Sequence, residues 1–343
     1  MFQNRRLRLL LQFVAGIVAV YAMSLLLSQA KEAYVTSTLP DGWAILRPPH
    51  EVSALMLDGE NLWEGGRDGL FLIDRESSQL LSLPSGTPQL SYVVDILRDR
   101  EERLWVAASQ GAFCLSGGSW RVLGTVEGAP PGAAKSLFED SSGAIWIGFE
   151  TGVLKYSDSN QQFFDRDSGL GLDSVDVILE DREGSLWFGS ASPTQGGLSR
   201  LAGQSWTSFT SKEHLPHNTV NDLLQDRQGR IWVGTGFSRR GGIGLLSQGS
   251  WRQLGMEEGL PGEKVRSFFE DSRGRLWVGS EYDGIVIFDD DRHQVLTPED
   301  GLAGWEVKVM VEDPDGVFRM GTEEGISRVE SLRTVASFSG VKQ

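Results

Sequence analysis

Residues 269–280 read FEDSRGRLWVGS, and six other segments of the chain repeat the same order of residue types. Each copy has an acidic turn, an apolar residue, an aromatic residue, a second apolar residue and a small residue. The aromatic anchors, at intervals of 42, 41, 41, 45, 45 and 41 residues, are Trp63, Trp105, Trp146, Trp187, Trp232, Trp277 and Phe318. A period of about forty residues is typical of the blades of a β-propeller.

Each copy predicts four short strands, which are clearest in the sixth. Strand a covers 265–269, strand b covers 276–279, and strand c covers 284–288. Strand d is short and begins with an aromatic residue, as in 251–254. The aspartate between strands a and b indicates a turn, because its carboxylate accepts hydrogen bonds from nearby backbone N–H groups. The strand-b tryptophans are large and flat enough to fill the wedge between neighbouring blades.

No segment outside residues 9–27 shows a long apolar period of 3.6 residues, so the body is expected to be all-β. Seven four-stranded units predict a seven-bladed β-propeller, whose radial repetition protects the sheet edges. Two segments compete to supply the last outer strand, 43–46 and 332–338. We favour Trp43–Leu46, because the next residues lead into a strand a, as they do after every other strand d.

The first thirty residues differ from the rest. Three arginines precede an apolar run over 9–27, whose helical length of about 28 Å is near the thickness of a bilayer core. The arginines should remain in the cytoplasm, so the body is expected to be exported to the periplasm. Ser28 and Ala30 are spaced for cleavage before Lys31, so a cleaved signal peptide and an uncleaved membrane anchor both remain open.

The expected organisation is therefore a signal peptide or anchor over 1–30, a linker over 31–41, the propeller over 42–338 and a tail over 339–343. The chain of 343 residues has a formal charge of −15, which becomes −18 once residues 1–30 are set aside. Such an acidic body should repel nucleic acid and anionic lipid. A single cysteine excludes an internal disulfide framework and a CxxC zinc site.

The repeat resembles the two-component regulator propeller repeat over roughly residues 42–330. The acidic turn, the LW-V-G strand, the following Gly-Leu or Gly-Ile strand and a Gly-Leu-Pro loop at 259–261 carry the resemblance. It implies the periplasmic sensor region of a hybrid two-component system, many of which respond to polysaccharide fragments. No kinase motif and no second apolar run follow, so we expect any signal to pass to a separate histidine kinase or envelope protein.

No catalytic residue, metal or cofactor is predicted. His214 and His217 lack a third nearby ligand for zinc. Asp165 and Asp167 lack the later ligands of an EF-hand and favour a solvated turn. Cys114 lies in an apolar run and is expected to be a buried, inert thiol.

Function is sought where the repeats differ. The loops between strands b and c are four residues longer in the fourth and fifth units than in the first three, at 190–197 and 235–242, and should project side by side. Trp305 replaces a small or polar residue in the seventh d–a loop, on the same face of a propeller. Loops on a rigid scaffold concentrate binding residues. The candidate ligand-binding residues are Gln195, His217, Asn218, Phe237, Arg239, Arg240, Tyr282 and Trp305.

Three functions follow from these residues. The first is a non-catalytic sensor or recognition module for a carbohydrate or other small ligand. The second is an envelope scaffold with protein partners only. The third is a propeller lyase or hydrolase, which would need an acid–base pair such as His217 with Glu263 or His50.

Overall fold

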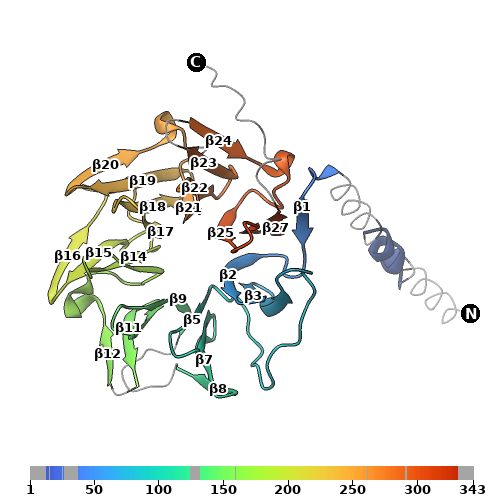
Figure 1. Cartoon of the computed structure of the whole chain (residues 1–343), viewed down its shortest axis with the longest axis horizontal. Coiled ribbons are helices and arrows are strands. Elements are labelled where there is room, and N and C mark those ends of the chain that lie inside the picture. Colours follow the sequence, from blue (N-terminus) through green and yellow to red (C-terminus); the bar gives the residue numbers. More distant parts are fainter. Residues whose placement is uncertain are drawn as a thin grey trace, which may run out of the picture.

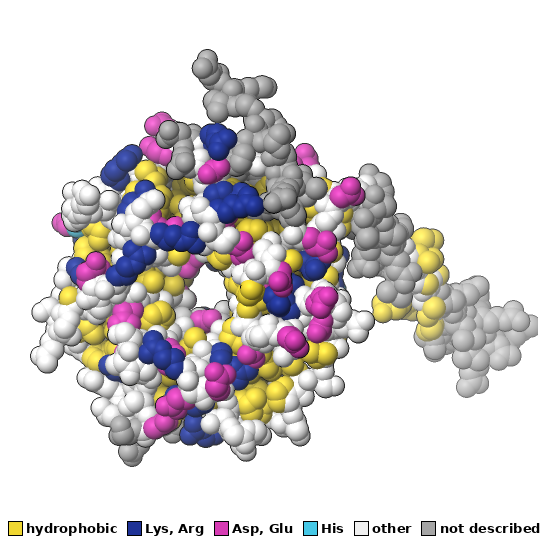
Figure 2. Space-filling model, viewed as in Figure 1, with side chains coloured by type: hydrophobic (Ala, Val, Ile, Leu, Met, Phe, Trp, Pro, Cys, Tyr) yellow, Lys and Arg dark blue, Asp and Glu magenta, His cyan; other side chains and the backbone are white. Residues whose placement is uncertain are grey.

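The protein is described here by a computed structural model, in which seven β-sheets are arranged around a central opening (Figures 1 and 2). The structure describes residues 13–14, 16–24, 26, 38–123, 132–158, 160–260, 262–289 and 292–330. The innermost strand of each sheet contacts the innermost strands of its two neighbours, so the ring is closed. The predicted seven-bladed β-propeller is confirmed.

The strands of the first four blades follow one another outward from the centre. Their bounds are β2 (Val52–Asp58), β3 (Asn61–Gly66) and β4 (Gly69–Asp74) in blade 1; β5 (Asp95–Arg98), β6 (Leu104–Ala108), β7 (Gly111–Ser116) and β8 (Ser119–Val122) in blade 2; β9 (Ala134–Glu139), β10 (Ile145–Phe149), β11 (Gly152–Ser157) and β12 (Asn160–Phe164) in blade 3; β13 (Val177–Glu180), β14 (Leu186–Ser190), β15 (Gly197–Ala202) and β16 (Ser205–Phe209) in blade 4.

The remaining blades repeat this order, and three short helical turns lie in the connections. The strands are β17 (Val220–Gln225), β18 (Ile231–Phe237), β19 (Arg240–Ser247) and β20 (Ser250–Leu254) in blade 5; β21 (Val265–Glu270), β22 (Leu276–Ser280), β23 (Ile285–Asp289) and β24 (Arg292–Leu296) in blade 6; β25 (Val307–Glu312), β26 (Phe318–Thr322), β27 (Gly325–Val329) and β1 (Trp43–Leu46) in blade 7. The turns are η1 (Arg166–Leu170), η2 (Met256–Glu258) and η3 (Pro298–Asp300).

The aspartate of each a–b turn does more than the sequence predicted. In blade 6, Asp271 accepts backbone N–H groups through one oxygen and the indole N–H of Trp277 through the other, at 3.0 Å. The same indole bond joins Asp181 to Trp187 at 2.7 Å. One aspartate therefore holds both the turn and the tryptophan of its blade. This explains why the two residues recur together in the repeats.

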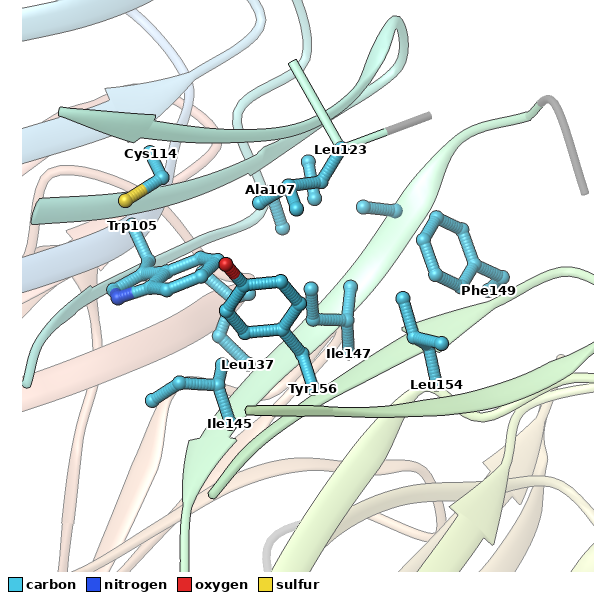
Figure 3. Packing of buried hydrophobic residues seen from close by; sticks show 12 residues of the cluster. Trp105, Ala107, Cys114, Leu123, Leu137, Ile145, Ile147, Phe149, Leu154 and Tyr156 are labelled. Atoms are coloured by element: carbon cyan, nitrogen blue, oxygen red, sulfur yellow. The ribbon is translucent and has the colours of Figure 1, made fainter. Parts of the chain in front are cut away.

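The hydrophobic core is divided among the wedges between blades. Figure 3 shows the wedge between blades 2 and 3, where the ring of Trp105 lies against Tyr156, with 5.4 Å between centroids. Ile145 and Ile147 of β10 complete the contact, and all these side chains are at most 5% exposed. The predicted role of the strand-b tryptophans as wedge fillers is confirmed.

Ring closure joins the two ends of the described body. Trp43 pairs with Val329 and Leu46 with Ile326, so β1 is the outer strand of blade 7 (Figure 1). The favoured closing strand is therefore confirmed. The competing segment 332–338 and the predicted tail over 339–343 lie outside the described residues.

Blade 7 corrects the position of one anchor. Arg319, rather than Phe318, occupies the tryptophan position: it lies six residues after Asp313 and donates to that carboxylate at 2.8 Å. It pairs with Val311 on β25, as Trp277 pairs with Phe269 on β21. The anchor at 318 was wrong because it followed aromatic character instead of distance from the turn aspartate.

Blade 1 also departs from the repeat. Its predicted fourth strand is reduced to one isolated bridge between Ile73 and Leu80, so the described sheet has three strands. Pro84, Gly86 and Pro88 follow closely, and prolines cannot continue a ladder of hydrogen bonds.

At the N-terminus, residues 16–24 are helical within the predicted segment 9–27. Among the residues that the structure describes, no helix is long and apolar enough to cross a membrane. The predicted cleavage site near Ala30 and most of the linker, 31–37, fall outside the described residues.

Candidate functional site

All eight predicted site residues lie on one face of the ring. Every strand a runs toward its aspartate turn, so the b–c and d–a connections emerge together at the opposite end of each blade. We call this end the loop face, and the end with the a–b turns the turn face. Connections of blades 4 to 7 on the loop face supply the eight residues.

The blade 4 connection meets the start of blade 5. Gly196 follows Gln195 and packs so closely on the backbone that an added Cβ would lie 2.4 Å from the carbonyl oxygen of Asn218. The side chain of Asn218 accepts the backbone N–H of Ser211 at 2.7 Å, which holds the d–a loop in place. Gln195 itself is exposed to solvent.

The four extra residues of blade 5 form a longer hairpin, in contrast to the expected loop. Strands β18 and β19 pair up to Phe237 and Arg240, leaving only Ser238 and Arg239 at the tip. Gly236 allows this, because an added Cβ there would lie 2.9 Å from the Cα of Lys264. The paired strands therefore carry Phe237 beside the tip, where this residue is 51% exposed.

The two arginines at the tip point to different neighbours. The guanidinium of Arg239 lies over the ring of Tyr282 in blade 6, 5.3 Å from its centroid. Burial, followed by the charge of Arg240, lowers the pKa of His217 below its ordinary value. The hairpin thus connects the d–a loop of blade 5 with the b–c loop of blade 6.

Trp305 completes the arc in blade 7. Its carbonyl accepts the backbone N–H of Gly284, two residues after Tyr282, at 3.1 Å. Its own N–H donates to Glu323 at 2.8 Å, and its side chain remains 44% exposed. The structure therefore brings the eight residues into one continuous arc from blade 4 to blade 7, which we call the loop-face arc.

Sequence reasoning missed a chain of ion pairs beside this arc. It runs through Glu281, Arg266, Glu306, Lys308 and Glu51, with Arg266 to Glu306 at 2.9 Å and Lys308 to Glu51 at 2.7 Å. Each of these two contacts joins neighbouring blades, from blade 6 to 7 and from 7 to 1. No sequence spacing marks these partners, because they come from different repeats.

Two carboxylates on inner strands were also missed. Asp95 accepts the backbone N–H of Leu137 in the next blade at 2.7 Å, and Asp222 accepts that of Phe268 at 2.6 Å. Burial raises the pKa of each to about 7, despite these hydrogen bonds. Both carboxylates have backbone partners and serve as ties between blades.

The geometry does not assemble an acid–base pair around His217. Its Nδ1 accepts the backbone N–H of Thr219 at 2.9 Å. Among the described residues, no carboxylate forms a hydrogen bond or an ion pair with this ring, and His50 instead contacts Asp68 at 3.3 Å.

The other chemical candidates have structural surroundings. The ring of His214 packs on Phe209 and Trp251, with centroids 5.3 and 5.6 Å away. Asp165 caps η1 by accepting the N–H of Ser168. Within the described ranges, no three metal-ligating side chains come together. Cys114 is fully buried, and burial raises the pKa of its thiol.

The fold defines the class: a seven-bladed β-propeller whose eight predicted site residues lie on the loop face. The family description "Two component regulator propeller" matches residues 214–237 and 259–282, in blades 5 and 6. These two blades therefore carry repeats that are similar to the two-component regulator propeller repeat. No curated protein sequence matches it.

Solved structures share this architecture. The extracellular domain of a hybrid two-component system from B. thetaiotaomicron matches with a TM-score of 0.74 and 19% identity over 86% of this chain. PorZ, a surface component of the type-IX secretion system of Porphyromonas gingivalis, matches with a TM-score of 0.63 and 15% identity over 82%. The chain spans only 42% and 46% of these two structures.

An enzyme shares the fold as well. Virginiamycin B lyase from Staphylococcus aureus matches with a TM-score of 0.63 and 11% identity, covering 83% of this chain and 97% of the lyase. At these identities each similarity shows the fold alone. Function must therefore be argued from the loop-face arc.

Proposed function

We propose that this protein is an exported, non-catalytic recognition propeller that binds a carbohydrate or another small ligand at the loop-face arc. The observation that carries the proposal is the continuity of the arc. Loops from four blades place Phe237, Tyr282 and Trp305 in solvent, each more than 40% exposed, beside two arginines. Aromatic and arginine side chains are the usual anchors of recognition sites.

The proposal includes a role in signalling. The match to the two-component regulator propeller repeat, and the fold shared with the extracellular domain of a hybrid two-component system, support a sensor whose bound state is read by a separate histidine kinase or envelope protein. A location outside the cytoplasm follows from the basic start and apolar run at the N-terminus. If residues 9–27 are not removed, the same segment anchors the propeller in the inner membrane.

A propeller lyase is the alternative that the fold similarity raises. The surroundings of His217 disfavour it, because Nδ1 is already engaged by a backbone N–H and the ring lacks a carboxylate partner among the described residues. Turnover of a polysaccharide or lactone that disappears in His217→Ala would establish the enzyme and overturn the non-catalytic proposal.

A thermal-shift screen of the protein against saccharides tests the proposal, because binding to the native state raises the unfolding midpoint. We expect at least one saccharide to raise the midpoint of the wild type. The combined variant Arg239→Gln, Arg240→Gln, Trp305→Ala should lose that shift. A matched control changes Arg252 to Gln and Val122 to Ala, two exposed side chains on the outer strands β20 and β8.

Two results would count against this function. A shift that survives in the arc variant would place the ligand elsewhere. No shift with any saccharide, together with co-purification of an envelope protein, would favour the scaffold alternative.

A further inference from the structure

Arg239 and Arg240, in the blade 5 hairpin, differ in their ion pairing from the other cations near the loop-face arc. Lys264 and Arg266 both contact Glu281, and Lys308 contacts Glu51 and Glu306. These cations are neutralised within the ring. Arg239 and Arg240 are not: among the described residues, no carboxylate forms an ion pair with either side chain.

Unpaired arginines are unexpected here, because the chain as a whole carries a formal charge of −15. Each guanidinium has five N–H donors and no acceptor. Both side chains are exposed, so these donors face solvent. Burial is the main cause of the lowered pKa of His217, and the charge of Arg240 adds to it.

Two nearby carboxylates are engaged by other partners. Glu281 is held by Lys264 and Arg266, and Glu323 accepts the backbone N–H groups of Trp305 and Glu306 at 2.8 and 2.9 Å. An anionic group placed at the hairpin tip would therefore meet a guanidinium, of Arg239 or of Arg240, that has no carboxylate partner among the described residues. Arginine binds planar anions with paired hydrogen bonds and is the preferred residue for that task.

The support beneath the two arginines is rigid. The ladder between β18 and β19 continues to the residues that flank the tip, and Gly241 packs so tightly that an added Cβ would lie 2.7 Å from the carbonyl oxygen of Glu263. Tyr282 lies under Arg239 and fixes its direction. Arg239, whose guanidinium lies over Tyr282, therefore loses less entropy on binding than a side chain without such a contact would.

We infer that the ligand of the loop-face arc is an acidic saccharide, bound through its anionic group by Arg239 and Arg240. This inference rests on the proposed function, since it specifies the ligand of the same site. The exposed ring of Trp305 offers an apolar surface to the flat side of a sugar ring. A carboxylate and a sulfate share the required chemistry, and the experiment separates them.

Binding is measured by calorimetry on the full chain with three probes: oligomers of galacturonic acid, oligomers of sulfated galactose, and neutral galactose oligomers. We expect one acidic series to bind at least tenfold more tightly than the neutral series. The variant Arg239→Gln, Arg240→Gln should weaken that binding at least tenfold, while Arg252→Gln leaves it unchanged. Raising the salt concentration should weaken the acidic ligand only.

The outcomes separate this inference from the proposed function. Tight binding of the neutral oligomers that Arg239→Gln, Arg240→Gln does not alter would overturn the acidic ligand and leave a saccharide sensor standing. Failure of both acidic and neutral oligomers to bind would overturn the inference and count against the proposed function as well. A preference for galacturonate or for sulfated galactose identifies the anionic group.

Discussion

Replacing Glu64 with valine should stabilise the protein, and the gain should increase with pH. Glu64 lies on β3 in the wedge between blades 7 and 1, is 1% exposed, and has no hydrogen-bond partner on either carboxylate oxygen. The matching residues of other blades are apolar, as in Val106, Val233 and Val278. Burial raises the pKa of Glu64 from 4.5 to about 8, although the charge of Arg319 opposes this.

The magnitude follows from linkage. The unfolded chain ionises Glu64 above pH 4.5, whereas the folded protein keeps it protonated up to about pH 8. The native state therefore binds more protons, and this group makes the wild type lose stability as pH rises between those values. Relative to low pH, where Glu64 is protonated in both states, the free energy of unfolding falls by about 1 kcal/mol at pH 5 and by about 3 kcal/mol at pH 7. Glu64→Val removes this loss.

The assay is denaturant unfolding of wild type and variant at pH 5 and pH 7. Asp95 and Asp222 also titrate near pH 7, so the difference between the two proteins isolates Glu64. Glu64→Gln is the control, because it removes the ionisation and keeps the shape. A gain that is equal at both pH values, or a destabilised valine variant, would refute the assignment of a buried, unpaired carboxyl group.

Three further predictions test the packing and the ties between blades. Trp277→Phe should cost about 1–3 kcal/mol in unfolding free energy, because Asp271 loses the indole donor; Trp120→Phe is the matched control, since its indole N–H has no partner, and equal losses would contradict the role of the bond. Asp222→Asn should reduce the loss of stability between pH 4 and pH 7, because the raised pKa of about 7 makes the native state retain a proton there; an unchanged pH slope in denaturant unfolding would show otherwise. Trp305→Ala should change stability by less than about 1 kcal/mol, because the side chain is 44% exposed, and a loss above about 2 kcal/mol would mean that Trp305 is a packing residue.

The number of blades could be predicted from the sequence because two coupled residues mark each one. In blades 2 to 6 the turn aspartate and the tryptophan six residues later satisfy each other, as Asp226 and Trp232 do at 2.8 Å. In blade 1 the tryptophan comes five residues after the aspartate, and in blade 7 an arginine takes its place. Arg319 was missed because an arginine can make the same bond to the aspartate without being aromatic. Distance from the turn is therefore a better guide to register than residue type.

The site could be predicted only in outline. Length differences between repeats indicated blades 4 and 5, but not that the second insertion would continue as a paired hairpin from Thr235 to Gly242. The partners of Arg266 and Lys308 come from neighbouring blades, so no local pattern reveals them. The burial of Glu64 likewise depends on how blade 1 meets blade 7 at ring closure.

The central claim is that the loop-face arc binds the ligand. Hydrogen exchange, measured with and without the saccharide that gives the largest thermal shift, tests it most directly. The account predicts slower exchange in segments 190–197, 235–242, 281–284 and 303–306, with no change in the a–b turns of the opposite face. Protection confined to the turn face, or spread evenly over all seven blades, would contradict it.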